Sequence, residues 1–267
     1  FKGGGWNSHF NTCQILEPCA TQLGLVPGTP PYLNAEAASA AFATGIHSFG
    51  PEEAVTWELG FKLDLADNTL RLNGAIFTTD YDELQFTYRS GVAPYLANAG
   101  KASIDGYELE MTWLPAEAWT LSAGIGGLDS SIDELRTLSI VQIGDLVGNN
   151  LPFAPELKYN IGIGYDGLVG GWTLAPRVDF VHSDQAYWDA GNTEEIAVDS
   201  DYSIINAAVA FGPESGPWRL RAAVTNATDE TYSTGGNSSL TTGAGYAEIA
   251  YSRPRQYFLY VDWEFGR

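Results

Sequence analysis

The sequence lacks any long apolar run. No stretch approaches the ~20 consecutive apolar residues that a membrane-spanning helix requires, although 45% of the 267 residues are hydrophobic. Basic residues are also scarce: 13 Lys and Arg stand against 33 Asp and Glu, which gives a formal net charge of −20. This charge excludes nucleic acid as a partner, because no basic surface could neutralise its phosphates. It suits a hydrated surface or loops that attract cations.

Residues suited to catalysis are few. The histidines His9, His47 and His182 are each isolated in the sequence, and no Gly-x-Ser-x-Gly motif supplies a nucleophile. No haem, nucleotide or zinc motif occurs either. We therefore expect neither an enzyme nor a bound cofactor, and binding or transport is the better interpretation.

Only two cysteines are present, Cys13 and Cys19, in a segment rich in glycine, proline and alanine. Their closeness predicts a small disulfide-closed loop in an oxidising compartment. A metal pair is disfavoured, because no nearby histidine or acidic cluster completes a site. The sequence has neither a starting Met nor a signal peptide. We expect either that a signal was removed or that the sequence begins inside a larger protein.

The last stretch of the chain, residues 256–267, follows a period of two. Apolar and aromatic side chains occupy alternate positions: Tyr257, Leu259, Val261, Trp263 and Phe265. The positions between them become acidic in the final half, at Asp262 and Glu264. Since successive side chains of a strand point to opposite faces, this pattern predicts an amphipathic strand. It fits the last strand of an outer-membrane barrel or of a soluble sandwich.

The same alternation recurs along most of the chain, separated by turns that suit the 30 glycines and 13 prolines. Together with the closing stretch and an N-terminal tail at residues 1–8, it predicts about ten strands. The others are expected at residues 55–63, 70–77, 107–113, 119–125, 159–165, 172–180, 202–211 and 218–224.

The connections between these strands alternate between short and long. Long connections are expected at residues 9–50, 80–98, 130–156, 183–201 and 227–250. Short turns on one side and long loops on the other are typical of an up-and-down membrane barrel, whereas a Greek-key sandwich has no reason to keep that order. We therefore predict an all-β fold, namely a partial, antiparallel, up-and-down transmembrane β-barrel.

Five tryptophans stand beside the short turns of this predicted barrel. Three begin strands and two end them: Trp119, Trp172 and Trp218, and Trp113 and Trp263. Indole rings prefer the boundary between membrane and water, so five of them at one height indicate an aromatic girdle. In a sandwich the same residues would pack in the core.

The positions opposite the apolar rows carry glycine, small polar residues and charges. Those that we expect to face a wet or plugged lumen are Arg71, Glu108, Glu110, Arg177, Asp179, Arg219 and Arg221, together with Glu58, Lys62 and Lys158. Most such charges pair with one another or stay hydrated.

One long connection combines aromatic and acidic residues. Tyr187 and Trp188 stand between Asp184 and Asp189, which makes both aromatic residues candidates for substrate binding. Ordinary packing at the base of a loop is the alternative.

Several motifs resemble the C-terminal half of the barrel of TonB-dependent outer-membrane receptors. Residues 51–53 (Pro-Glu-Glu), followed by residues 57–62 (Trp-Glu-Leu-Gly-Phe-Lys), are similar to one landmark of that family. The most specific match joins residues 98–102 (Asn-Ala-Gly-Lys-Ala) to residues 106–110 (Gly-Tyr-Glu-Leu-Glu). Residues 226–229 (Asn-Ala-Thr-Asp) and residues 254–255 (Pro-Arg) fit later landmarks. Each motif is weak alone, but their order and spacing together are specific and cover nearly the whole chain.

The resemblance implies a barrel of about twenty-two strands, of which residues 1–267 would supply roughly the last ten. The N-terminal plug, the segment that contacts TonB and the early strands would be absent. It also implies a receptor in the outer membrane of a Gram-negative bacterium, for energised uptake of a scarce nutrient, most often a ferric siderophore. The implied partners are membrane lipid, the absent plug and strands, the TonB complex through the plug, and a small siderophore-like ligand.

Phe265 stands where the family places its closing aromatic residue, and it is thereby the implied contact for the barrel-assembly machinery. The chain continues to Gly266 and Arg267, whereas many members end on the aromatic residue. Two other functions fit the residues. One is a passive outer-membrane pore or structural barrel, and the other is a secreted carbohydrate-binding β-sandwich.

Overall fold

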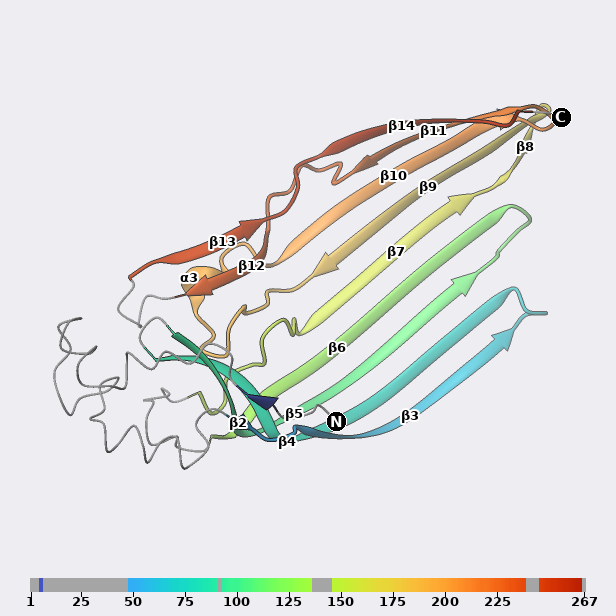
Figure 1. The fold of residues 1–267 in the computed structure, drawn as a ribbon. Coiled ribbons are helices and arrows are strands. Elements are labelled where there is room, and N and C mark those ends of the chain that lie inside the picture. Colours follow the sequence, from blue (N-terminus) through green and yellow to red (C-terminus); the bar gives the residue numbers. More distant parts are fainter. Residues whose placement is uncertain (1–4, 7–47, 91–92, 136–145, 239–244, 266–267) are drawn as a thin grey trace, which may run out of the picture.

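One antiparallel sheet dominates the computed structural model (Figure 1). The structure describes residues 5–6, 48–90, 93–135, 146–238 and 245–265. The sheet has 10 strands: β3 (Glu53–Leu65), β4 (Leu70–Ser90), β5 (Ala93–Trp113), β6 (Trp119–Leu135), β7 (Leu157–Tyr165), β8 (Gly167–Val169), β9 (Trp172–Ser183), β10 (Tyr202–Pro213), β11 (Trp218–Thr225) and β14 (Gln256–Trp263). β8 follows β7 and pairs with the same neighbour, β9, and the remaining strands lie side by side in chain order.

Smaller elements lie outside this sheet. β1 (Gly5–Trp6) pairs with β2 (Ser48–Phe49), and β12 (Ser233–Ser238) pairs with β13 (Ala247–Tyr251). A short helix, α3 (Glu194–Ala197), precedes β10. The strand expected at residues 1–8 is thus described only as β1, which does not join the main sheet. None of the helices in the described ranges is long and apolar enough to cross a membrane.

The main sheet forms a single layer. Every position of β3 is exposed, and Trp57 and Leu259 have 73% and 69% of their surface accessible. In a β-sandwich one face of each sheet would be buried against the other sheet. The β-sandwich alternative is therefore wrong, and the expected antiparallel, up-and-down order of strands is confirmed.

The connections at one end of the sheet are short, as predicted, and those at the other end are long except between β4 and β5. The short turns span residues 66–69, 114–118, 170–171 and 214–217. They lie at the same end of the sheet as the C-terminal end of β14, and the long connections lie at the other end (Figure 1). The first turn is tight, because Ala66, Asp67 and Asn68 have φ values of 50°, 54° and 66°.

The long loop expected at residues 80–98 is wrong. β4 and β5 are each 21 residues long and pair up to Ser90 and Ala93. A β-bulge near Glu83, whose φ is 57°, shifts the register without ending the ladder. At about 3.3 Å per residue each strand spans roughly 70 Å, far more than a bilayer core requires. The hairpin therefore extends well beyond the apolar band of the sheet.

The missed strands share one physical cause. Outside the apolar band of the sheet, nothing requires an apolar side chain at every second position, although the backbone still pairs. For the same reason β6 continues to Leu135, into the loop expected at residues 130–156, and β12 and β13 lie inside the loop expected at 227–250. Most of the connection at residues 9–50, including Cys13 and Cys19, lies outside the described residues.

Asn98 and Gly100 fasten the base of the long hairpin. The Asn98 amide donates to the carbonyl of Glu83 at 2.7 Å and to that of Gly50 at 3.1 Å. A Cβ at position 100 would lie 1.7 Å from the carbonyl oxygen of Glu134. Only glycine allows β5 and β6 to approach so closely, which gives the Asn-Ala-Gly motif a structural role.

We predict that Gly100→Ala lowers the free energy of unfolding of the full-length protein by about 3 kcal/mol, because backbone must move to admit the methyl group. Gly126→Ala is the matched control on β6, since a Cβ there meets nothing nearer than the Tyr107 carbonyl at 3.7 Å. Its effect should stay below about 1 kcal/mol. Urea denaturation in detergent measures both variants. Equal stability of the two variants would contradict the close approach.

Candidate functional site

The two faces of the sheet differ in chemistry. Directly paired residues of neighbouring strands share a face, and within the apolar band no register shift interrupts the pairing from β3 to β14. One face, here called the polar face, carries all the residues that were expected to line a lumen: Arg71, Glu108, Glu110, Arg177, Asp179, Arg219 and Arg221, with Glu58, Lys62 and Lys158. The structure therefore places them on one wall, and their exposure to a lumen stays a prediction.

Arginines on the polar face are paired with aspartates. Arg71 Nε lies 2.7 Å from Asp64 Oδ1, and Arg221 Nε lies 3.0 Å from Asp262 Oδ2. The Arg221 guanidinium also lies 5.4 Å from the centre of the Tyr260 ring. Exposed pairs of this kind contribute little to stability, because water and salt screen the two charges. Their effect is mainly to neutralise the wall locally.

Arg177 lies across neighbouring strands instead of projecting from the wall. Its Nη2 is 2.6 Å from Asp179 Oδ1 and donates to Ser122 Oγ on β6 at 3.3 Å. The path from β9 to β6 crosses β7, where a Cβ on Gly162 would come within 2.8 Å of that nitrogen. Glycine on β7 thus leaves the space that the flat guanidinium occupies.

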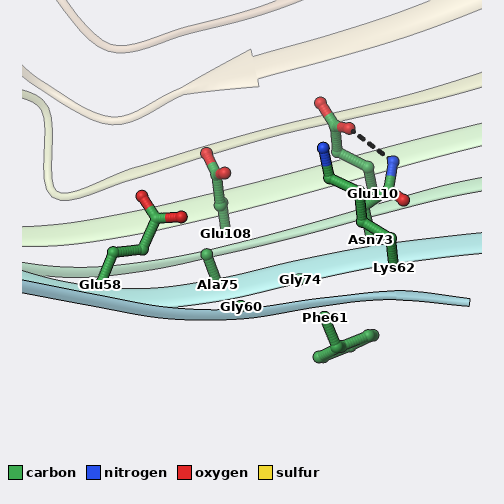
Figure 2. A pocket seen from close by; sticks show the side chains of 9 residues that line it. All are labelled: Glu58, Gly60, Phe61, Lys62, Asn73, Gly74, Ala75, Glu108 and Glu110. Atoms are coloured by element: carbon green, nitrogen blue, oxygen red, sulfur yellow. Dashed lines mark hydrogen bonds between the residues drawn. The ribbon is translucent and has the colours of Figure 1, made fainter.

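An acidic hollow of about 460 Å³ occupies the polar face over β3, β4 and β5 (Figure 2). Glu58, Glu108 and Glu110 line it with Lys62 and Asn73. Glu110 accepts a hydrogen bond from the Asn73 amide at 3.4 Å. Three carboxylates and one ammonium group leave this part of the wall negative, so it would attract cations and disfavour anions.

The opposite, apolar face carries the five tryptophans. All of Trp113, Trp119, Trp172, Trp218 and Trp263 lie on this face next to the short turns. Trp218 pairs directly with Trp263, and Trp172 stacks on Phe211 with ring centres 4.9 Å apart. Their common height fits the expected girdle, which stays a prediction because no lipid is present to test it.

Tyr187 and Trp188 both have partners within the protein. The Tyr187 hydroxyl donates to Glu194 Oε1 at 2.9 Å. That hydrogen bond, aided by burial and by nearby carboxylates, raises the pKa of Tyr187. Trp188 donates its indole N–H to Ser233 Oγ at 3.3 Å. Neither contact excludes a ligand, so substrate binding at these residues stays a prediction.

His182, which is isolated from the other histidines in the sequence, has hydrogen-bond partners in the fold. Its Nδ1 is 2.8 Å from Ser203 Oγ and its Nε2 is 2.9 Å from Asp184 Oδ1. Ser203 faces it across the strand pair, and Tyr159 lies beside it with ring centres 4.7 Å apart. In serine hydrolases the serine bonds Nε2 and the aspartate Nδ1, which is the reverse of this order. The hydrogen bond to Ser203 and the ring contact with Tyr159 tie the loop ends of β7, β9 and β10 together.

A second set of landmark residues closes the base of the last long loop. The Asn226 amide donates to the carbonyl of Glu230 at 2.7 Å and to that of Arg253 at 3.3 Å. Asp229 Oδ1 accepts from the backbone N–H of Arg255 at 2.8 Å, and its carboxylate lies 3.5 Å from the guanidinium. Residues 226–229 and 254–255 are therefore one structural unit that aligns β11 with β14, which their separation in the sequence concealed.

The fold and these landmarks agree with a known family. The model of the TonB-dependent receptor-like β-barrel matches residues 24–227. The chain belongs to this family. Its members are β-barrels of the Gram-negative outer membrane, which confirms the expected location.

The chain is similar in sequence to two receptors of this family. The probable TonB-dependent siderophore receptor PiuA of Acinetobacter baumannii is 33% identical over 148 residues, which are 54% of this chain and 19% of PiuA. The pesticin receptor of Yersinia pestis is 29% identical over 146 residues, 54% of this chain and 20% of the receptor. The chain thus spans about a fifth of these relatives. They are receptors and not enzymes, as expected.

Solved structures show the same fold. The ferric yersiniabactin uptake receptor FyuA from Yersinia pestis superposes with a TM-score of 0.67 at 22% identity, covering 82% of this chain and 31% of FyuA. The structure of PiuA from Acinetobacter baumannii gives 0.64 at 25% identity, covering 80% and 29%. The sheet is therefore part of a barrel wall.

Adjacent alanines on β11 test which face meets lipid. Ala222 lies on the apolar face and Ala223 on the polar face. We predict that a fluorophore attached to Ala222→Cys is quenched by brominated lipid and that one attached to Ala223→Cys is quenched by aqueous iodide, because only the apolar face contacts acyl chains. Both variants are made in the full receptor with Cys13 and Cys19 replaced by serine. Equal quenching at both sites, or the reverse, would show that the faces are wrongly assigned.

Proposed function

We propose that this chain is the C-terminal part of the barrel of a receptor that takes up a ferric siderophore or a similar iron complex. The observation that carries this proposal is the similarity to the siderophore receptor PiuA, 33% identity over 148 residues. Fold similarity to the ferric yersiniabactin uptake receptor FyuA supports it. The polar face would then line the lumen, and the apolar face would meet membrane lipid.

Uptake would be energised through parts of the receptor that lie outside these 267 residues. No other strand in the described part of the chain pairs with the outer edges of β3 and β14. Exposed edges of this length are a liability that barrels remove by closure. We infer that the remaining strands of the same receptor cover both edges, that a plug fills the lumen, and that the TonB complex acts on the plug.

The long loops are the parts suited to capture the ligand. Tyr187 presents an aromatic ring beside Glu194 in the loop between β9 and β10. Deletion of this whole loop would be a poor test, because it also contains Ile196, which is 0% exposed, and Ser200, which bonds the backbone of Ala186. Single substitutions leave that packing in place.

We predict that Tyr187→Ala weakens binding of the ferric siderophore to the full receptor about tenfold, as the loss of one aromatic contact would. Tyr187→Phe is the matched control, since it removes only the hydroxyl that bonds Glu194, and its affinity should stay within about threefold of the wild type. Intrinsic fluorescence quenching by the ferric complex measures both. Unchanged affinity in Tyr187→Ala would exclude Tyr187 as a ligand contact.

A second measurement separates the receptor from a passive pore. Cells that express the full receptor as their only siderophore receptor should accumulate radiolabelled iron complex, and this uptake should stop when the tonB gene is deleted. A passive pore would admit the complex at the same rate with or without TonB. Absence of uptake in both strains would contradict the proposed cargo but not the barrel.

Phe265 provides a test of assembly. Its side chain lies past the end of β14, 86% exposed and 6.4 Å from Trp263 between ring centres. We predict that Phe265→Ala lowers the amount of folded receptor in the outer membrane severalfold, because an exposed aromatic residue beyond the end of β14 is available to the assembly machinery. Leu259→Ala, within β14 and 69% exposed, is the control. Equal levels of the two variants in heat-modifiability gels would show that Phe265 has no special part in assembly.

A further inference from the structure

Three long connections meet at Trp188. They are the segment 146–156 before β7, the segment 184–201 between β9 and β10, and the β12–β13 hairpin. Each is far from the others in the sequence, and each begins at a different strand of the sheet. We call the meeting point the loop junction and define it by Trp188, Phe153, Ile196, Ser233 and Gly236.

The first segment is fastened to the second on both sides of Trp188. The rings of Phe153 and Trp188 have centres 5.4 Å apart, and the backbone N–H of Phe153 donates to the carbonyl of Tyr187 at 2.8 Å. Asn150 and Asn192 exchange two hydrogen bonds, at 2.8 Å and 2.9 Å. Hydrogen bonds to the backbone and a contact between two rings therefore fix the position of the first segment on the second.

The hairpin is fastened through its first strand. Ser233 is 1% exposed, accepts the indole N–H of Trp188 at 3.3 Å, and donates its own backbone N–H to the carbonyl of Asp199 at 2.7 Å. A Cβ on Gly236 would lie 2.8 Å from Trp188 Cδ1 and 2.8 Å from the Cβ of Ile196. The glycine therefore admits the indole ring and the helix α3 against the hairpin.

We infer that Trp188 is a positioning residue that joins the three long loops into one body. A half-buried indole with partners on two other segments contributes packing area and a directed hydrogen bond at a single point. Without it, the hydrogen bonds between Asn150 and Asn192 and between Ser233 and Asp199 would still join neighbouring segments, but no side chain of 184–201 would contact both of the other segments at one point. The inference concerns the loops themselves and holds whatever ligand the receptor binds. The adjacent residues Tyr187 and Trp188 thus differ in role. Trp188 contacts the other two segments, whereas the Tyr187 hydroxyl bonds Glu194 within its own loop.

The consequence is coupling between segments. A substitution at the loop junction should loosen segments that it does not belong to, whereas loops that moved independently would respond only locally. Trp188→Ala removes the ring and its donor. Gly236→Ala disturbs the same point from the hairpin side, and Gly235→Ala is its matched control, since a Cβ at that position meets nothing within 4 Å.

Hydrogen exchange of the full receptor in detergent, without ligand, tests the coupling. In Trp188→Ala we expect amide exchange to become about tenfold faster in residues 146–156 and in 233–238 together, because both lose the same anchor. Gly236→Ala should do the same, and Gly235→Ala should match the wild type. Exchange in 172–183, the strand β9, should stay unchanged in all variants, which shows that the barrel itself remains folded.

Two outcomes would overturn the inference. In the first, Trp188→Ala speeds exchange only within 184–201, which would mean that the other loops do not depend on this residue. In the second, Gly236→Ala and Gly235→Ala behave alike, which would mean that the hairpin does not pack on the indole ring. Trp188→Phe separates ring from hydrogen bond, since it should keep most of the protection if packing is the main anchor.

Discussion

The constraint on which this structure depends is the pairing of every backbone group within a single layer. In a bilayer an unpaired N–H or C=O costs several kcal/mol, so strands must pair on both sides. The continuous pairing from β3 to β14 satisfies the backbone groups of the inner strands, and its register within the apolar band determines which side chains lie on each face. Because side chains alternate, the same ladder that pairs the backbone sends charges to one face and tryptophans to the other. The outer edges of β3 and β14 have no partner strand among the described residues, so their backbone groups require further strands.

Residues that mark the family sequence have mainly a structural role here. Gly100 lets two strands approach, Asn98 binds the backbone of the preceding segments, and Asn226 holds both ends of the last long loop. All of them lie where a strand leaves the apolar band, at the loop end of the sheet. Such points need irregular backbone with fixed hydrogen bonds, which asparagine and glycine supply. The landmarks therefore set the positions from which the loops project, while the loops carry the differences between receptors.

The part of the fold within the apolar band was predictable from the sequence, because one face there meets lipid and alternation is enforced. The extended hairpin of β4 and β5 was not predictable in this way, since its outer part lies beyond the apolar band, where nothing requires an apolar side chain at every second position. Contacts between distant segments were equally hidden. Neither the partners of His182 nor the junction around Trp188 leaves a local pattern, because each forms between residues that only the sheet order brings together. In the sequence the junction appears only as a tryptophan, a serine and two adjacent glycines, and none of these residues indicates which segment it contacts.

The central claim is that these strands form part of the wall of a membrane barrel whose polar face encloses the interior. A structure of the full receptor in a lipid nanodisc, determined by electron cryomicroscopy, tests it most directly. The account predicts that β14 and β3 each pair along their outer edges with further strands of the receptor, that Arg177 and Glu110 face the interior, and that the five tryptophans lie at one level against lipid. A second protein layer packed on the apolar face, or lipid against the polar face, would contradict it.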